Sequence, residues 1–119
     1  MLRFLIFVWI IIYPFNASAA ELWMVEEEGC PWCEKWDEEI APIYPKTNEG
    51  KFAPLARIDI ADTRGDPRFS KALIYTPTFV LVLENQEVAR IEGYPGEDFF
   101  WALLHEALVE YSDYRREEE

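Results

Sequence analysis

Two cysteines separated by two residues, Cys30 and Cys33, lie where a short apolar run gives way to a helical pattern. Residues 22–25 predict a buried strand before them, and apolar residues recur every three to four positions after them. A cysteine at a helix N-terminus lies beside unpaired backbone amides and the positive end of the helix dipole, and both favour thiolate over thiol. The position therefore indicates a reactive dithiol, with Cys30 as nucleophile and Cys33 as resolving thiol.

The two residues between the cysteines complete the active-site loop: Pro31 stiffens the turn and has no amide to donate, and Trp32 adds apolar surface. A purely structural disulfide is disfavoured, because so small a loop gains little entropic stabilisation. A zinc site needs four ligands, and the chain adds only one distant histidine, His105, to its two cysteines. Attachment of haem needs a histidine directly after the second cysteine, where Glu34 stands. We therefore expect neither a metal nor a cofactor.

The other patterns predict the element order β-α-β-α-β-β-α. Strands are expected at residues 22–25, 55–60, 78–83 and 88–92, and helices from 33 to about 42, over 68–73 and over 99–111. A strand–helix–strand start implies a parallel pair, and the short connection at 84–87 predicts an antiparallel hairpin. The fold class is therefore α/β: a mixed four-stranded sheet with helices on both faces, and with the dithiol beyond the carboxyl ends of strands. In the last helix we expect one apolar stripe, made of Phe99, Phe100, Leu103, Leu104, Ala107, Leu108 and Tyr111.

The first nineteen residues have the pattern of a signal peptide. Arg3 precedes an apolar stretch over residues 4–13, Pro14 interrupts it, and the small residues at 17–19 suit a signal peptidase. Ten apolar residues are too few to cross a bilayer, which takes about 20. We expect cleavage after residue 19, an exported domain over 20–119, and no stable membrane anchor afterwards. The alternative is an uncleaved anchor whose apolar stretch continues towards Leu22.

The formal net charge of −12 bears on the partners. It argues against nucleic acid, since a phosphate backbone requires a basic footprint, and it would steer basic protein surfaces towards the chain. Three of the acids, Glu26, Glu27 and Glu28, lie just before the dithiol, separated from Cys30 only by Gly29. They either form a plain solvated loop or lie close enough to raise the pKa of Cys30 by like-charge repulsion. In the second case the thiolate is destabilised, which favours the disulfide and makes the dithiol more reducing.

A second motif, Thr76-Pro77-Thr78, enters the strongest predicted strand, where a proline cannot donate to the ladder. A CxxC pair after a first strand, followed about 44 residues later by Thr-Pro-Thr-Phe, resembles the thioredoxin superfamily. The resemblance implies a thioredoxin fold, a cis bond before Pro77, and backbone hydrogen bonds from Thr76 to a bound peptide. It also implies that Gly93 brings the backbone close to the site.

Four segments are similar to the small periplasmic SoxS-type thioredoxins of bacterial sulfur-oxidation operons. They are the leader, the W-M-V-E-x-x-G-C-x-W-C stretch, the I-Y-T-P-T-F-V segment and the final G-Y-x-G-x-D-x-F-W helix. This likeness implies a periplasmic reductase, which we expect to be monomeric. Its substrate would be a disulfide-bearing partner protein of sulfur oxidation, and its electrons would come from a membrane donor. A thiol oxidase or isomerase, and a non-catalytic peptide-binding module, remain alternatives.

The chain departs from typical thioredoxins in its Pro31-Trp32 pair, where they carry Gly-Pro, and at two further positions. Met24 stands where they carry a buried aspartate that assists proton transfer, and Gly29 stands where a tryptophan usually precedes the first cysteine. Gly29 directly precedes Cys30, and Met24 lies six residues before it.

Overall fold

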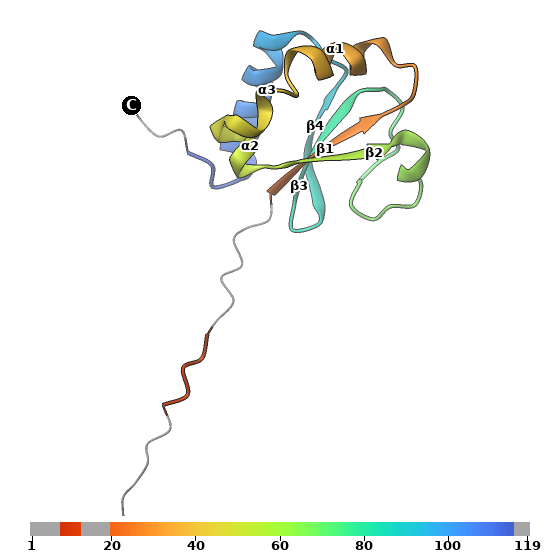
Figure 1. Cartoon of the computed structure of the whole chain (residues 1–119). Helices are drawn as coiled ribbons and strands as arrows, with labels where there is room; N and C mark the ends of the chain where they lie inside the picture. The colour runs from red at the N-terminus through yellow and green to blue at the C-terminus, as the bar shows by residue number, and fades with distance from the viewer. Residues whose placement is uncertain (1–7, 13–19, 116–119) are drawn as a thin grey trace, which may run out of the picture.

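A computed structural model describes residues 8–12 and 20–115, and in this part of the chain a four-stranded sheet forms the centre (Figure 1). The strand order is β2-β1-β3-β4. β1 pairs in parallel with β2 and antiparallel with β3, and β3 pairs antiparallel with β4. The mixed sheet and the hairpin predicted from the sequence are thereby confirmed. The strands are β1 (Ala20–Glu26), β2 (Leu55–Asp59), β3 (Thr78–Leu83) and β4 (Gln86–Glu92).

The predicted signal peptide lies outside the described residues except for 8–12, which form neither helix nor strand. Across the described ranges, none of the helices has both the length and the apolar character needed to cross a bilayer.

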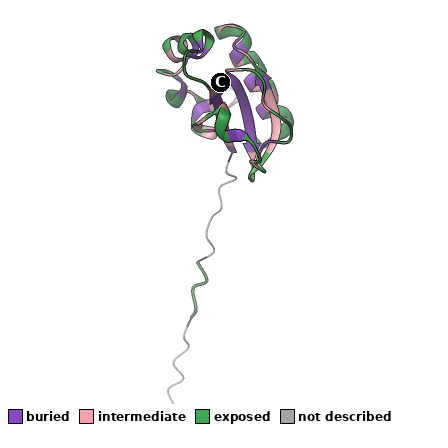
Figure 2. Ribbon diagram, turned by 90° about the vertical axis from the view of Figure 1, so that its right-hand side faces the viewer, coloured by how far each residue is buried: buried purple, intermediate pink, exposed green. Residues whose placement is uncertain are grey.

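Three α-helices pack on one face of the sheet (Figure 1). β1 and β3 contribute Leu22, Met24 and Phe79 to this side, and the helices contribute Trp36 and Phe100, all of them fully buried. Figure 2 shows the buried central strands between the outer layers. The helices are α1 (Pro31–Glu39), α2 (Asn48–Phe52) and α3 (Glu97–Tyr111).

The opposite face is covered by an irregular segment, residues 60–77, instead of by an α-helix. Val25, Val80 and Val82 form the apolar patch of the sheet there, and Phe69 packs on them. The only helix described in this segment is one 3-10 turn, η2 (Ile60–Thr63). The prediction of a helix over 68–73 was therefore wrong, although the fold class itself is confirmed, with the short 3-10 helix η2 in the segment on this face.

The physical reason lies in the hydrogen bonds that this segment makes to β4. The carbonyl oxygen of Arg68 accepts from the backbone amide of Glu87 at 2.8 Å, and the amide of Ser70 donates to the Glu87 carboxylate at 3.0 Å. The carbonyls of Lys71 and Ala72 accept from the guanidinium of Arg90 at 3.1 and 3.2 Å. Partners about 17–19 residues away thus replace the bonds that a helix would make within itself.

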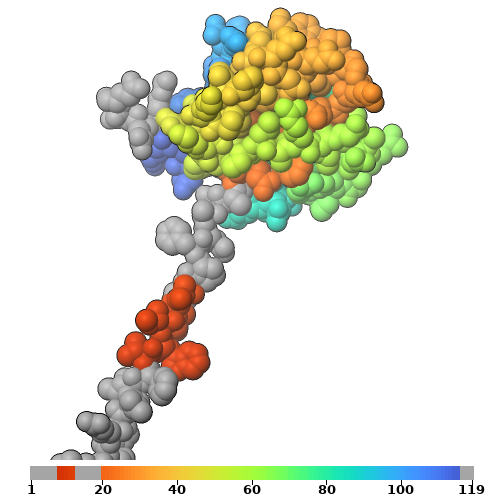
Figure 3. Space-filling model, in the orientation of Figure 1, coloured from red at the N-terminus to blue at the C-terminus, as the bar shows by residue number. Residues whose placement is uncertain are grey.

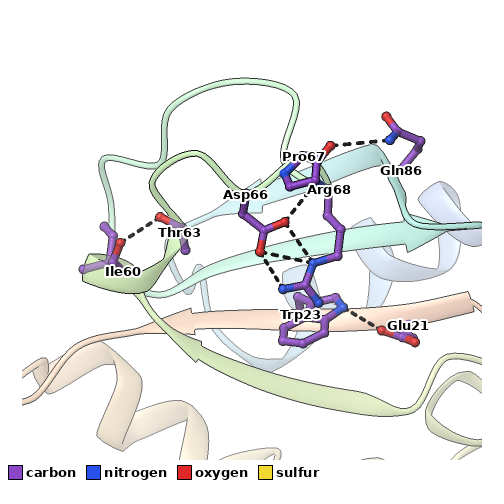
Figure 4. A network of polar contacts seen from close by, with 8 residues as sticks. All are labelled: Glu21, Trp23, Ile60, Thr63, Asp66, Pro67, Arg68 and Gln86. Carbon is purple, nitrogen blue, oxygen red and sulfur yellow. Dashed lines mark hydrogen bonds and ion pairs between the residues drawn. The ribbon is translucent and has the colours of Figure 1, made fainter.

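A stacked arginine also fixes the segment to the sheet (Figure 4). The guanidinium of Arg68 lies 4.0 Å from the ring centroid of Trp23 and forms an ion pair of 2.6 Å with Asp66. The indole N–H of Trp23 donates to Glu21 at 2.7 Å. These contacts hold the segment over the sheet.

The apolar stripe predicted for the last helix is only half buried. Phe100, Leu104 and Leu108, spaced four residues apart, are buried, whereas Phe99 and Leu103 are 67% and 41% exposed. Tyr111 is also exposed. α3 therefore packs through one row of side chains, and the adjacent row faces outward.

Gly50 in α2 has no room for a side chain. Its Cβ position overlaps the carbonyl oxygen of Tyr44, a buried residue whose hydroxyl donates to the Ala53 carbonyl at 2.6 Å. Helical Gly→Ala changes usually stabilise, but here we expect Gly50→Ala to lower the free energy of unfolding by about 1–3 kcal/mol through the clash. Urea unfolding measures this, with Lys51→Ala at the adjacent exposed position as control, expected within about 0.5 kcal/mol of the wild type. Equal stability of Gly50→Ala and the wild type would contradict the packing.

Candidate active site

Cys30 is the N-cap residue of α1, and Pro31 opens the helix. The backbone N–H of Cys33 donates to the Sγ of Cys30 at 3.1 Å, so the cysteine side chain caps the helix. The two cysteines form a disulfide, with their Cα atoms 5.2 Å apart. The hydrogen bond from the Cys33 amide and the helix dipole would both stabilise a thiolate on Cys30 after reduction.

Most of the disulfide is covered, and its neighbours are exposed. Cys30 and Cys33 are 8% and 4% exposed, whereas Trp32 is 55% exposed. The ammonium of Lys35 lies 5.4 Å from the ring centroid of Trp32. An approaching disulfide would therefore meet a narrow sulfur edge beside a broad aromatic surface.

An open hollow borders the disulfide on one side, and we call it the acidic hollow. In Figure 3 the orange segment that carries the cysteines lies above the green segment that follows β2. Carboxylates dominate the walls of the hollow, and they come from the end of β1, the loop before α1, α1 itself and the end of β2. Its lining residues are Glu26, Glu27, Glu28, Gly29, Cys30, Cys33, Glu34, Asp37 and Asp59.

The second sequence motif lies next to the loop that precedes the cysteines. The Thr76–Pro77 bond is cis, as the resemblance implied, and Pro77 is buried. The hydroxyl of Thr76 donates to the carboxylate of Glu27 at 3.5 Å. The amide of Gly93 donates to the Pro77 carbonyl at 2.7 Å, and its φ of +84° suits glycine. The structure thus brings Thr76, Pro77 and Gly93 together, and Thr76 contacts Glu27, one of the acids that line the acidic hollow.

The three glutamates before Cys30 have different surroundings. Glu26 ends β1 and accepts from the guanidinium of Arg57 at 2.7 Å. Glu27 accepts from Thr76, and Glu28 is exposed. All three line the acidic hollow beside the cysteines, as the second interpretation of their sequence required. Their effect on the thiols remains a prediction.

Sequence reasoning missed Arg57 and Asp37. Arg57 lies on β2 opposite Met24 of β1, and its guanidinium also donates to Asp37 of α1 at 2.7 Å. Desolvation lowers the pKa of Arg57, but hydrogen bonds to Asp37 and Glu26 outweigh it and raise that pKa above its ordinary value. The spacing of Asp37, four residues after Cys33 on one helix face, was the signal that could have found it. Arg57 needs the strand register, which the sequence does not show.

These ion pairs are partly exposed, so their share of the folding energy is small. The side chains of Arg57, Glu26 and Asp37 are 37%, 32% and 42% exposed. Pairs of this kind contribute about 0–1 kcal/mol each. The ion pairs of Arg57 therefore contribute little to the stability of the fold.

The described residues include no group of three or more histidine, cysteine or acidic side chains that could hold a metal ion. His105, the one histidine, lies on α3 with its Nδ1 3.8 Å from a carboxylate oxygen of Glu49 on α2. It is partly exposed, at the rim position expected from the sequence.

A solved structure is similar to this chain over most of its length. It is the crystal structure of the periplasmic thioredoxin SoxS from Paracoccus pantotrophus in its reduced form. The two share 44% sequence identity with a TM-score of 0.72, and the match covers 76% of this chain and 96% of that one. No protein-family model and no curated protein matches the chain. This chain and the solved structure are therefore similar both in sequence and in fold.

Proposed function

The chain belongs to the thioredoxin family, with a SoxS-like sequence and a Cys30–Cys33 disulfide, and we propose that it is a periplasmic reductase of protein disulfides. The coarser activity, thiol–disulfide exchange, follows from the family and the cysteine pair. The observation that carries the proposal is the position of that pair: Cys30 caps α1 and accepts a hydrogen bond from the backbone amide of Cys33. The similar SoxS is a periplasmic protein, which supports the location.

The reaction uses the two cysteines in sequence. In the dithiol form the Cys30 thiolate attacks one sulfur of the partner's disulfide, which forms a mixed disulfide and releases the first partner thiolate. Cys33 then loses its proton and attacks the Cys30 sulfur. The bond to the partner breaks, and the second partner thiolate leaves. The partner has gained two electrons, and the chain has the Cys30–Cys33 disulfide, which a membrane electron donor would reduce again.

The carboxylates of the acidic hollow support reduction as the direction. Negative charge near a sulfur disfavours its thiolate, so it favours the disulfide form of the pair and makes the dithiol a stronger reductant. The net charge of −12 would also attract a basic partner surface. We propose a disulfide-bearing protein of sulfur oxidation as that partner, on the basis of the SoxS-like sequence.

An equilibrium titration against glutathione tests the direction. A reductase should have a potential well below about −200 mV, towards the roughly −270 mV of thioredoxin. A potential near −120 mV, typical of strong oxidants, would overturn the proposal.

Replacing Cys33 with serine should trap the partner. The first attack still occurs, but no thiol remains to release the product, so a covalent complex accumulates. We expect a band on a non-reducing gel that disappears with dithiothreitol, and mass spectrometry of that band identifies the partner.

The double variant Cys30→Ser, Cys33→Ser is the matched control and should trap nothing. If it also keeps full function in the cell, the chain is a peptide-binding module and not an enzyme.

A further inference from the structure

The guanidinium of Arg57 is held by groups from two elements, β1 and α1. Nη1 donates to Glu26 at the end of β1 at 2.7 Å, and Nη2 donates to Asp37 of α1 at 2.7 Å. Nη1 also lies 3.5 Å from the sulfur of Met24, and Cζ lies 5.8 Å from the ring centroid of Trp36. The arginine therefore connects β2, β1 and the helix that carries the cysteines.

Both carboxylates bound by Arg57 line the acidic hollow together with Cys30 and Cys33. The lining includes no cationic side chain among the described residues. Arg57 is not one of the lining residues, but it forms ion pairs with two of the lining acids, Glu26 and Asp37. The carboxylates in the lining are Glu26, Glu27, Glu28, Glu34, Asp37 and Asp59.

We propose that Arg57 is a positioning residue that sets the reducing strength of the cysteine pair by holding Glu26 and Asp37 and offsetting their charge. This inference rests on the proposed function, because it concerns the regulation of the same site. A positive charge near a thiolate stabilises it, and a negative charge destabilises it. Arg57 therefore limits how strongly the acidic hollow opposes ionisation of the two thiols.

The consequence for the redox equilibrium has a definite sign. When Arg57 is removed, the carboxylates of Glu26 and Asp37 keep their negative charges but lose their positive partner. The thiolate becomes less stable, the thiol pKa rises, and the exchange with glutathione shifts towards the Cys30–Cys33 disulfide. Loss of Glu26 or Asp37 has the opposite effect, because it removes one negative charge and frees part of the guanidinium.

The test compares Arg57→Met with the wild type by glutathione titration and by the thiolate absorbance as a function of pH. We expect the equilibrium constant to move threefold to tenfold towards the disulfide, where tenfold corresponds to about 30 mV for this two-electron couple. Arg57→Lys keeps the charge and should recover at least half of the shift on a logarithmic scale. Arg64→Met removes the same charge from the exposed residue that follows η2 and should leave the constant unchanged.

Glu26→Gln and Asp37→Asn should each lower the thiol pKa and move the constant the other way. These two variants decide the question if Arg57→Met does not fold, as checked by circular dichroism. In about 1 M salt the Debye length is about 3 Å, so the differences in equilibrium constant between the variants and the wild type should become smaller. A purely structural effect would persist at this salt concentration.

The inference is overturned if Arg57→Met stays within twofold of the wild type or shifts towards the dithiol. It is equally overturned if Arg64→Met shifts as much as Arg57→Met. The proposed function fails on a separate result, the potential of the unaltered chain, so the two failures are distinguishable.

Discussion

Serine in place of Cys30 abolishes disulfide reduction. We expect the turnover of an oxidised peptide substrate to fall by at least about 10³-fold, in the range seen when an enzyme loses its covalent nucleophile. The reason is chemical: a hydroxyl stays protonated at neutral pH and cannot form the mixed disulfide on which exchange depends. The N-cap position of Cys30 has no value for catalysis without its sulfur.

The loss of turnover in Cys30→Ser must be distinguished from unfolding of the variant. The disulfide closes a very short loop, so through chain entropy it stabilises the fold by only about 2 kcal/mol. With no disulfide in either protein, the Cys30→Ser variant should have a Tm close to that of the reduced wild type. Cys33→Ser is the matched control, since it removes the other sulfur and should still show one burst of mixed-disulfide formation. Turnover by Cys30→Ser near the wild-type rate would mean that Cys33 is the attacking thiol.

The sequence predicted those parts of the fold that depend on neighbouring residues. β3 has the predicted bounds, because residues 78–83 are almost all β-branched, leucine or aromatic and are buried on both faces. The site was predictable for a similar reason, since a strand, two cysteines and a helix follow one another directly in the chain. The position of the cysteines at the start of α1 is local information.

Features that depend on distant partners were not predictable. Residues 68–73 have a plausible helix start at Pro67, but Glu87 and Arg90 of β4 bind their backbone instead. Arg57 has an ordinary place in a strand, and only the parallel register with β1 brings it to Glu26. In both cases the deciding contact joins residues more than fifteen positions apart, which no local pattern encodes.

The last helix gives a third example, and it leads to the prediction with the largest effect on stability. Phe99 and Phe100 are adjacent and equally apolar, so periodicity placed both in one stripe. In the structure Phe100 is fully buried, with the rings of Phe79 and Trp36 at centroid distances of 4.9 and 5.7 Å, whereas Phe99 is 67% exposed. Tyr94 and Trp101 also lie against the Phe100 ring. This side chain therefore joins α3 to β3 and to α1.

Phe100→Ala should lower the free energy of unfolding by about 3–5 kcal/mol, because it removes a ring from the centre of an aromatic cluster and leaves a cavity. For a domain of this size, 1 kcal/mol changes Tm by about 4–8 °C, so we expect a decrease of about 15–30 °C. Phe99→Ala, its exposed neighbour, should change the stability by no more than about 0.5 kcal/mol. Thermal unfolding followed by circular dichroism measures both, and similar losses would contradict the assignment of the buried row.

Measuring both redox states makes the same experiment informative about the site. Trp36 belongs to α1 and packs on Phe100, so the cavity lies under the helix that begins at the disulfide. If Phe100 contributes only packing, its loss destabilises the oxidised and reduced forms equally. The thermodynamic cycle then requires an unchanged glutathione equilibrium constant. A shifted constant would mean that the core under α1 holds the cysteines in a geometry that favours one redox state, and the shift would give the size of that coupling.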